Sequence, residues 1–138
     1  MTRGTGEQLD RQALIEALLE QHSDLRFAIV FGSRARGGTG RPDSDLDLAV
    51  DVGRKLSLNE RATMSGELER VAGCPVDLVD LWQAGPILAM QILKKGEVLL
   101  APKRLALAEF RMLTPARYED WKRMVRPVER AILQRFSR

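Results

Sequence analysis

The sequence has very little cysteine, histidine or aromatic content. Of its 138 residues, one is Cys, one is His and 5% are aromatic. A single thiol, Cys74, cannot form an internal disulfide framework. Cys74 and His22 together supply too few ligands for the usual tetrahedral zinc site. We therefore expect a reducing, cytoplasmic setting and no structural zinc.

Long hydrophobic runs are also missing. The longest uninterrupted apolar run is Phe27 to Phe31, far short of the ~20 residues that a membrane helix needs. The amino-terminal stretch MTRGTGEQLDRQ has no apolar core of the kind found in a signal peptide. These features predict a soluble chain that is neither exported nor inserted in a membrane.

The charges nearly balance over the whole chain but not along it. The formal net charge is +3, and 44% of the residues are hydrophobic, which suits one folded domain. Residues 103–138 contain ten Lys and Arg against four Asp and Glu, so a basic tail follows a mildly acidic body. Such a tail can bind nucleic acid or an acidic partner, or can simply be the solvated face of a helix. We favour the last interpretation and consider nucleic acid an unlikely partner.

Hydrophobic periodicity predicts alternating helices and strands. Ser57 and Glu60 form a capping-box pattern at the start of one helix, and Gly73 follows its end. We expect helices over 7–21, 58–71 and 86–95, strands over 25–31, 44–52, 76–81 and 98–100, and helix from 102 onward, interrupted or kinked at Pro115 and Pro127. The fold class is therefore α/β (α+β): a small mixed β-sheet flanked by helices, with a C-terminal helical extension.

Two aspartates in the second predicted strand differ from ordinary surface acids. Because side chains alternate along a strand, Asp45 and Asp47 share one face, with Cα atoms about 6.5 Å apart. The residues between and after them, such as Leu46 and Leu48, give the opposite face an aliphatic character. Two carboxylates at this spacing can hold divalent metal ions for phosphoryl transfer. The simpler alternative is an acidic solvent-exposed strand face.

The segment after the first predicted strand favours the metal interpretation. There a buried strand runs into the tight turn Gly32-Ser33, followed by Arg34 and Arg36. Gly32 permits close approach of the backbone, the Ser33 hydroxyl can donate to a phosphate oxygen, and either arginine can add positive charge. A phosphate cradle next to a metal-binding pair is the arrangement that chemistry on a nucleoside triphosphate needs.

Two competing motifs do not fit the same region. An EF-hand beginning at Asp43 would place Leu48 at the required glycine and Arg54 at the required glutamate. The glycines at 37, 38 and 40 are not followed by Lys-Ser or Lys-Thr, so they do not form a Walker P-loop. We interpret the glycine-rich stretch as a flexible connection.

With Gly32-Ser33 and Ser44-Asp45-Leu46-Asp47 in place, the chain resembles the minimal nucleotidyltransferases of the DNA polymerase β superfamily. The resemblance is strongest to the small prokaryotic MntA-type antitoxins that oppose HEPN ribonuclease toxins, and it covers roughly residues 25–100. It implies a nucleotidyltransferase domain over 1–101, with 102–138 as a helical extension packed on it. One departure is that eleven residues separate Ser33 from Asp45, where the small antitoxins commonly have ten. The glycine-rich loop can absorb the insertion.

The family also uses a third carboxylate on a neighbouring strand. Asp77 and Asp80 are the two candidates, and their spacing places them on opposite faces of a strand, so only one can join Asp45 and Asp47. We choose Asp77 because it lies early in the strand and matches the family pattern. Asp80 could instead end the strand in a turn.

The resemblance implies a Mg²⁺-dependent transfer of AMP from ATP to a protein hydroxyl, a tyrosine of a cognate HEPN toxin. Asp45, Asp47 and Asp77 would ligate two Mg²⁺ ions, and Asp77 would help to deprotonate the acceptor. Gly32 and Ser33 would bind the nucleotide phosphates, assisted by Arg36 and Ser44.

Two other functions stay open at this point. The chain could neutralise a toxin by binding alone, or could modify a small molecule of the aminoglycoside type. The segment after Pro102 is predicted to be a pair of helices that binds a protein partner. Self-association into a homo-oligomer is a further alternative.

Overall fold

The computed structural model describes residues 10–32 and 45–136. Within these ranges, four strands form one mixed sheet in the order β3-β2-β1-β4. The strands are β1 (Phe27–Phe31), β2 (Leu46–Asp51), β3 (Val76–Asp80) and β4 (Glu97–Leu100). Strand β1 pairs antiparallel with both β2 and β4, whereas β2 and β3 are parallel. The mixed α/β class predicted from the sequence is confirmed.

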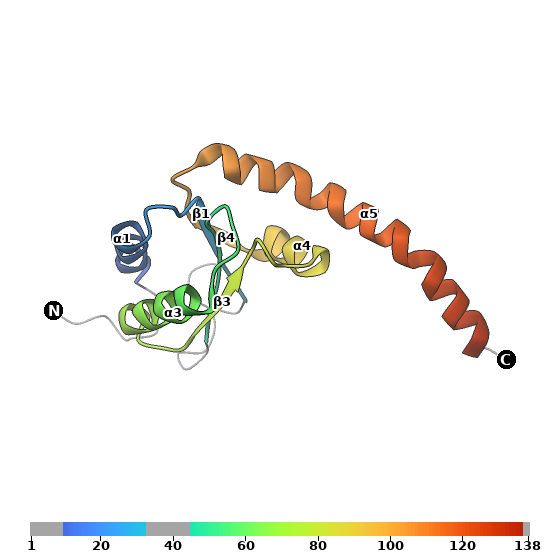
Figure 1. Cartoon of the computed structure of the whole chain (residues 1–138), viewed down its shortest axis with the longest axis horizontal. Coiled ribbons are helices and arrows are strands. Elements are labelled where there is room, and N and C mark those ends of the chain that lie inside the picture. Colours follow the sequence, from blue (N-terminus) through green and yellow to red (C-terminus); the bar gives the residue numbers. More distant parts are fainter. Residues whose placement is uncertain (1–9, 33–44, 137–138) are drawn as a thin grey trace.

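Helices α1 (Arg11–Gln21) and α3 (Leu58–Ala72) cover one face of the sheet (Figure 1). The start of α1 is capped by Asp10, whose side chain accepts a hydrogen bond from the Ala13 amide at 3.0 Å. The predicted capping box at the start of α3 is present, and Gly73 ends this helix in the left-handed region. The aliphatic residues of both helices and of the facing side of the sheet form the larger of two buried cores.

The other face of the sheet is covered by α4 (Pro86–Lys95) and by the first part of α5 (Arg104–Phe136). Its smaller core contains Phe27 and Ile29 from β1 and Leu107 from α5. The rings of Phe27 and Phe110 contact each other, with centroids 5.3 Å apart. These contacts fix the direction in which α5 leaves the sheet.

The predicted pair of C-terminal helices is wrong, because α5 is a single helix of 33 residues that runs through both Pro115 and Pro127. Each proline removes one helical hydrogen bond, to the carbonyl four residues earlier. Those carbonyls belong to Arg111 and Arg123, which are exposed, so water can bind them instead. The helix accordingly curves without breaking (Figure 1). Although α5 is long, no helix within residues 10–32 and 45–136 is apolar enough to cross a membrane.

Candidate active site

Asp47 and Asp77 are direct neighbours on the two parallel strands. The register pairs Asp47 of β2 with Asp77 of β3, so both side chains lie on the sheet face that α4 and α5 cover only in part. Asp45 immediately precedes β2 and is exposed. On the opposite face, Leu46, Leu48 and Val50 are fully buried, as alternation predicts. The structure therefore brings the three predicted carboxylates to one end of the sheet.

The acids destabilise one another electrostatically. Burial of Asp47 raises the pKa of its carboxyl group above the ordinary 3.8, and the charges of Asp77 and Asp45 and a hydrogen bond with Asp77 raise it further. Within the part of the chain that the structure describes, none of the three makes an ion pair with Lys, Arg or His. A cation bound between these groups would relieve the repulsion.

Gly32 lies against the same carboxylate. Phe31 is paired with Asp47 in the antiparallel ladder, so the residue that follows it passes beside the Asp47 side chain. The backbone of Gly32 has φ +76°, and an added Cβ would overlap the Asp47 carboxylate. Glycine is required here both by the backbone conformation and by the close approach.

These carboxylates suit Mg²⁺ better than a metal ion whose ligands all come from the protein. Among residues 10–32 and 45–136, no three His, Cys, Asp or Glu side chains converge closely enough to hold a metal ion by themselves. Mg²⁺ is usually held by one or two carboxylates, with waters and substrate phosphates completing its shell. Asp47 and Asp77 form such a carboxylate pair, and Asp45 stands next to it.

Asp80, the other candidate for the third carboxylate, lies on the opposite face of β3 and is 2% exposed. Its carboxylate accepts hydrogen bonds from the backbone amides of Leu56, at 2.8 Å, and Trp82, at 3.0 Å. The Gln83 side chain donates a third, at 3.2 Å. Asp80 thus joins the turn after β3 to the loop before α3, and it is Asp77 that lies beside the other acids.

Most of the predicted nucleotide-binding residues cannot be placed. Ser33, Arg36 and Ser44 lie outside the described residues, as does Arg34. Of that set, the structure places only Gly32, which adjoins the acids.

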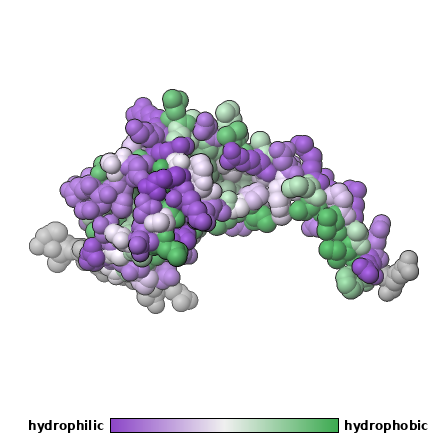
Figure 2. Space-filling model, in the orientation of Figure 1, coloured by the Kyte–Doolittle hydropathy of each residue, from purple (hydrophilic) through white to green (hydrophobic). Residues whose placement is uncertain are grey.

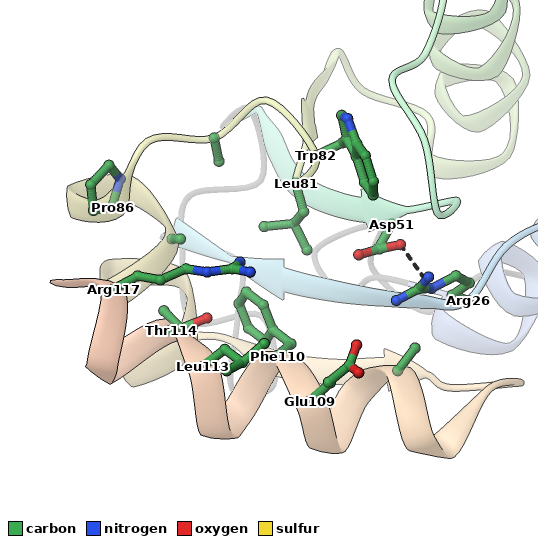
Figure 3. A pocket seen from close by; sticks show the side chains of 13 residues that line it. Arg26, Asp51, Leu81, Trp82, Pro86, Glu109, Phe110, Leu113, Thr114 and Arg117 are labelled. Carbon is green, nitrogen blue, oxygen red and sulfur yellow. Dashed lines mark ion pairs between the residues drawn. The ribbon is translucent and has the colours of Figure 1, made fainter. Parts of the chain in front are cut away.

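Sequence reasoning missed a pocket of about 360 Å³ between β2, α4 and α5 (Figure 3). Its walls include Leu81 and Phe110, and its rim includes Arg117. At one side lies the ion pair of Arg26 with Asp51, at 3.2 Å. Asp51 is four residues beyond Asp47 on the same strand face, about 13 Å away along the strand. No local pattern predicts this pocket, because it forms only where α5 packs on α4.

Comparison with known proteins gives a consistent result. Residues 14–104 match the family model described as polymerase beta, nucleotidyltransferase. The protein adenylyltransferase MntA of Shewanella oneidensis is 31% identical over 93 residues, which cover 67% of this chain and 66% of that protein. The chain thus matches just under two thirds of the length of this relative.

Solved structures share the fold over almost the whole chain. A toxin-antitoxin crystal structure with AMP-PNP superposes with a TM-score of 0.79 and 25% identity, covering 91% of this chain and 99% of that one. The MNT antitoxin in complex with a tri-AMPylated Shewanella oneidensis HEPN toxin superposes with a TM-score of 0.73 and 23% identity, covering 89% and 95%. The family match spans well over half of the sequence and includes both strands that carry the acids. This chain therefore belongs to the polymerase β nucleotidyltransferase family.

Proposed function

We propose that this chain transfers AMP from ATP to a hydroxyl of a protein, a tyrosine of a HEPN-family toxin, and thereby acts as an antitoxin. The observation that carries the proposal is the Asp47–Asp77 pair, which the register of β2 and β3 places side by side. Gly32 lies next to this pair, and any side chain there would overlap the Asp47 carboxylate. The 31% identity to a protein adenylyltransferase supports the reaction. The likeness to a toxin-antitoxin bound to AMP-PNP supports ATP as the nucleotide and a toxin as the acceptor.

In this proposal Asp45, Asp47 and Asp77 would hold two Mg²⁺ ions when ATP is bound. Bound Mg²⁺ supplies positive charge that stabilises the phosphates during transfer. Asp77 accepts the proton of the acceptor hydroxyl, whose oxygen bonds to the α-phosphorus as the bond to pyrophosphate breaks. Gly32, with Ser33, Arg36 and Ser44, binds the phosphates. We place the reaction in the cytoplasm, where ATP and the RNA substrates of a ribonuclease toxin are found.

The proposal is tested by incubating the full chain with purified HEPN-family proteins of its source genome and ATP labelled at the α-phosphate. We expect one of them to be labelled, and we expect Asp47→Asn to lower the labelling rate more than about 100-fold, since the amide removes a metal-binding charge but keeps the shape.

Asp51→Asn is the matched control, because Asp51 lies on the same strand and face but is paired with Arg26. It should keep the labelling rate per folded molecule. Full labelling by the Asp47→Asn protein would rule out the catalytic proposal. A toxin that is neutralised without ever being labelled would instead establish an antitoxin that acts by binding alone.

A further inference from the structure

One face of α5 is buried in its first half and exposed in its second. Leu107, Phe110 and Thr114 face the body of the protein, and two of them are more than nine-tenths buried. Steps of three, four and seven residues continue this same face through Trp121, Val128 and Ile132. The distal half of α5, defined here as residues 120–136, therefore presents to solvent, beyond the partly buried Trp121, the face that the proximal half packs on the sheet.

The distal half of α5 has no covering within the described residues. Met124 is 70% exposed, Val128 58% and Ile132 50%. Figure 1 shows this part of the helix extending away from the sheet, and Figure 2 shows hydrophobic surface along its inner edge and hydrophilic surface along its outer edge. Helices with interior prolines are weak when isolated, so their stability must come from packing of an apolar face. This face is therefore suited to a protein partner.

The charges that flank this face indicate the character of that partner. Residues 120–136 contain five Lys and Arg against two Asp and Glu. Among the described residues, the ion pairs that the distal half of α5 makes are the long contacts Lys122–Glu119, at 3.8 Å, and Arg123–Asp120, at 3.6 Å. Arg126 and Arg130 make no ion pair with any described residue. An apolar stripe with a basic rim complements an apolar, acidic protein surface, whereas nucleic acid would bind the charges and leave the stripe exposed.

The position of α5 relative to the acids also favours a protein partner. Its inner face packs on the sheet face that carries Asp47 and Asp77. The pocket of Figure 3 is lined by Phe110, Leu113 and Arg117, which precede the distal half along α5. The similar toxin-antitoxin structure covers 91% of this chain, so it must include the larger part of α5 wherever the uncovered residues lie.

We propose that the distal half of α5 is the docking surface for a protein partner with an apolar, acidic surface, and that this partner is the toxin that receives AMP. The identity of the partner rests on the proposed function. The apolar stripe supplies the contact area, the arginines orient the partner, and its docked position lies beside the sheet face with the acids.

The test compares two substitutions on the same exposed helix. Val128→Asp places a charge in the stripe, and Leu133→Asp places the same charge roughly 140° away around the helix. Both residues are more than half exposed, so neither change should affect folding. We expect Val128→Asp to raise the Kd for the labelled HEPN protein at least tenfold, and Leu133→Asp to change it less than about twofold. AMP transfer by Val128→Asp should recover at high toxin concentration, with KM raised and kcat kept.

The other outcomes separate this proposal from the proposed function. Equal toxin binding by wild-type and Val128→Asp protein would overturn the docking surface, whereas loss of labelling in Asp47→Asn would still support catalysis. Light scattering could instead show a dimer in the wild type and in Leu133→Asp and a monomer in Val128→Asp. That result would assign the face to a second copy of this chain and overturn the proposal. Loss of salt-sensitive affinity for a single-stranded RNA in Val128→Asp would overturn it in favour of nucleic acid. A toxin that binds through this face but is never labelled would support the docking surface and rule out the proposed AMP transfer.

Discussion

Asp80 and Asp47 lie on opposite faces of the sheet and have opposite surroundings. On the α1–α3 face, Asp80 is almost fully buried, yet every hydrogen bond that it accepts comes from a neutral amide, two of them from the backbone. On the α4–α5 face, the partial burial of Asp47 raises the pKa of its carboxyl group, and its acidic neighbours Asp77 and Asp45 raise it further. Strands β2 and β3 thus carry one carboxylate, Asp80, that hydrogen bonds stabilise and another, Asp47, whose charged form the fold disfavours.

The difference separates structural acids from functional ones by their partners. Hydrogen-bond donors around a buried carboxylate offset its loss of water, so Asp80 needs nothing further. Like charges placed side by side cost stability unless a cation is bound between them. Residues that lower stability in the free protein persist where function requires them. Asp47 and its acidic neighbours Asp45 and Asp77 are of this kind, which agrees with the proposed metal site.

Substitutions of the two aspartates on β3 should have the largest and most clearly opposed effects. Asp77→Asn should lower AMP transfer to the HEPN protein more than about 100-fold, because a metal-binding charge and the proposed proton acceptor are both lost. Its urea midpoint without metal should equal or exceed that of the wild type, since one repulsive charge is gone. Retained transfer with a lowered midpoint would place Asp77 among the structural acids.

Asp80→Ala is the matched variant on the same strand. It should have the opposite effects, namely lower stability with AMP transfer retained. Removing the carboxylate leaves the amides of Leu56 and Trp82 buried without their acceptor. We expect the free energy of unfolding to fall by about 2–4 kcal/mol. Transfer per folded molecule should stay near the wild-type rate at a temperature where the variant is still folded. A stable variant without activity would contradict the structural role of Asp80.

The choice between Asp77 and Asp80 illustrates what the sequence could and could not predict. Side-chain alternation predicts that Asp45 and Asp47 share a face and that Asp77 and Asp80 do not. Which of the latter two faces Asp47 depends on the register of β3 on β2, a long-range pairing that no local pattern contains. Resemblance to the family, not periodicity, favoured Asp77.

The start of α3 could be predicted because its signal is local. The course of α5 could not, because it depends on the surroundings of the two prolines. The capping box at Ser57 and Glu60 is a local signal, and the helix begins there as predicted. At Pro115 and Pro127 the local signal predicts an interruption or a kink, but Arg111 and Arg123, whose carbonyls lose a donor, are exposed, and the helix continues. The pocket beside Phe110 likewise depends on packing between α4 and α5, for which the sequence offers no local sign.

At Gly32 the backbone lies directly against the Asp47 carboxylate. Gly32→Ala adds a Cβ that overlaps the Asp47 carboxylate at a backbone conformation that alanine rarely adopts. We expect a loss of about 1–2 kcal/mol in the free energy of unfolding and a clear fall in ATP affinity, because the carboxylate must move. Gly66→Ala is the control, since nothing lies within 4 Å of its added Cβ in α3. Unchanged ATP affinity in Gly32→Ala would show that the position of the Asp47 carboxylate does not matter.

The smallest effect is a dependence of stability on pH. The pKa of Asp47 is raised in the folded protein, so the fold favours the protonated carboxyl. Its contribution to stability is therefore fully present below the ordinary pKa of 3.8 and is lost as the pH rises through the raised value. Other acids change in the opposite direction: a hydrogen bond from Arg54 holds the pKa of Glu60 at about 2. The effect of Asp47 must therefore be measured as the difference in the free energy of unfolding between the wild type and a variant that lacks this charge.

Urea unfolding of the metal-free wild type and of Asp47→Asn, between about pH 3.5 and pH 7, isolates that difference. We expect the variant to gain stability relative to the wild type as the pH rises, by less than about 1 kcal/mol, because the group is partly exposed and screened. Adding Mg²⁺ with ATP at neutral pH should reverse the order, since only the wild type retains the full set of carboxylates. A difference that is constant with pH would mean that neither burial nor the neighbouring acids disfavour the charged form of Asp47, and the proposed metal site would lose its electrostatic support.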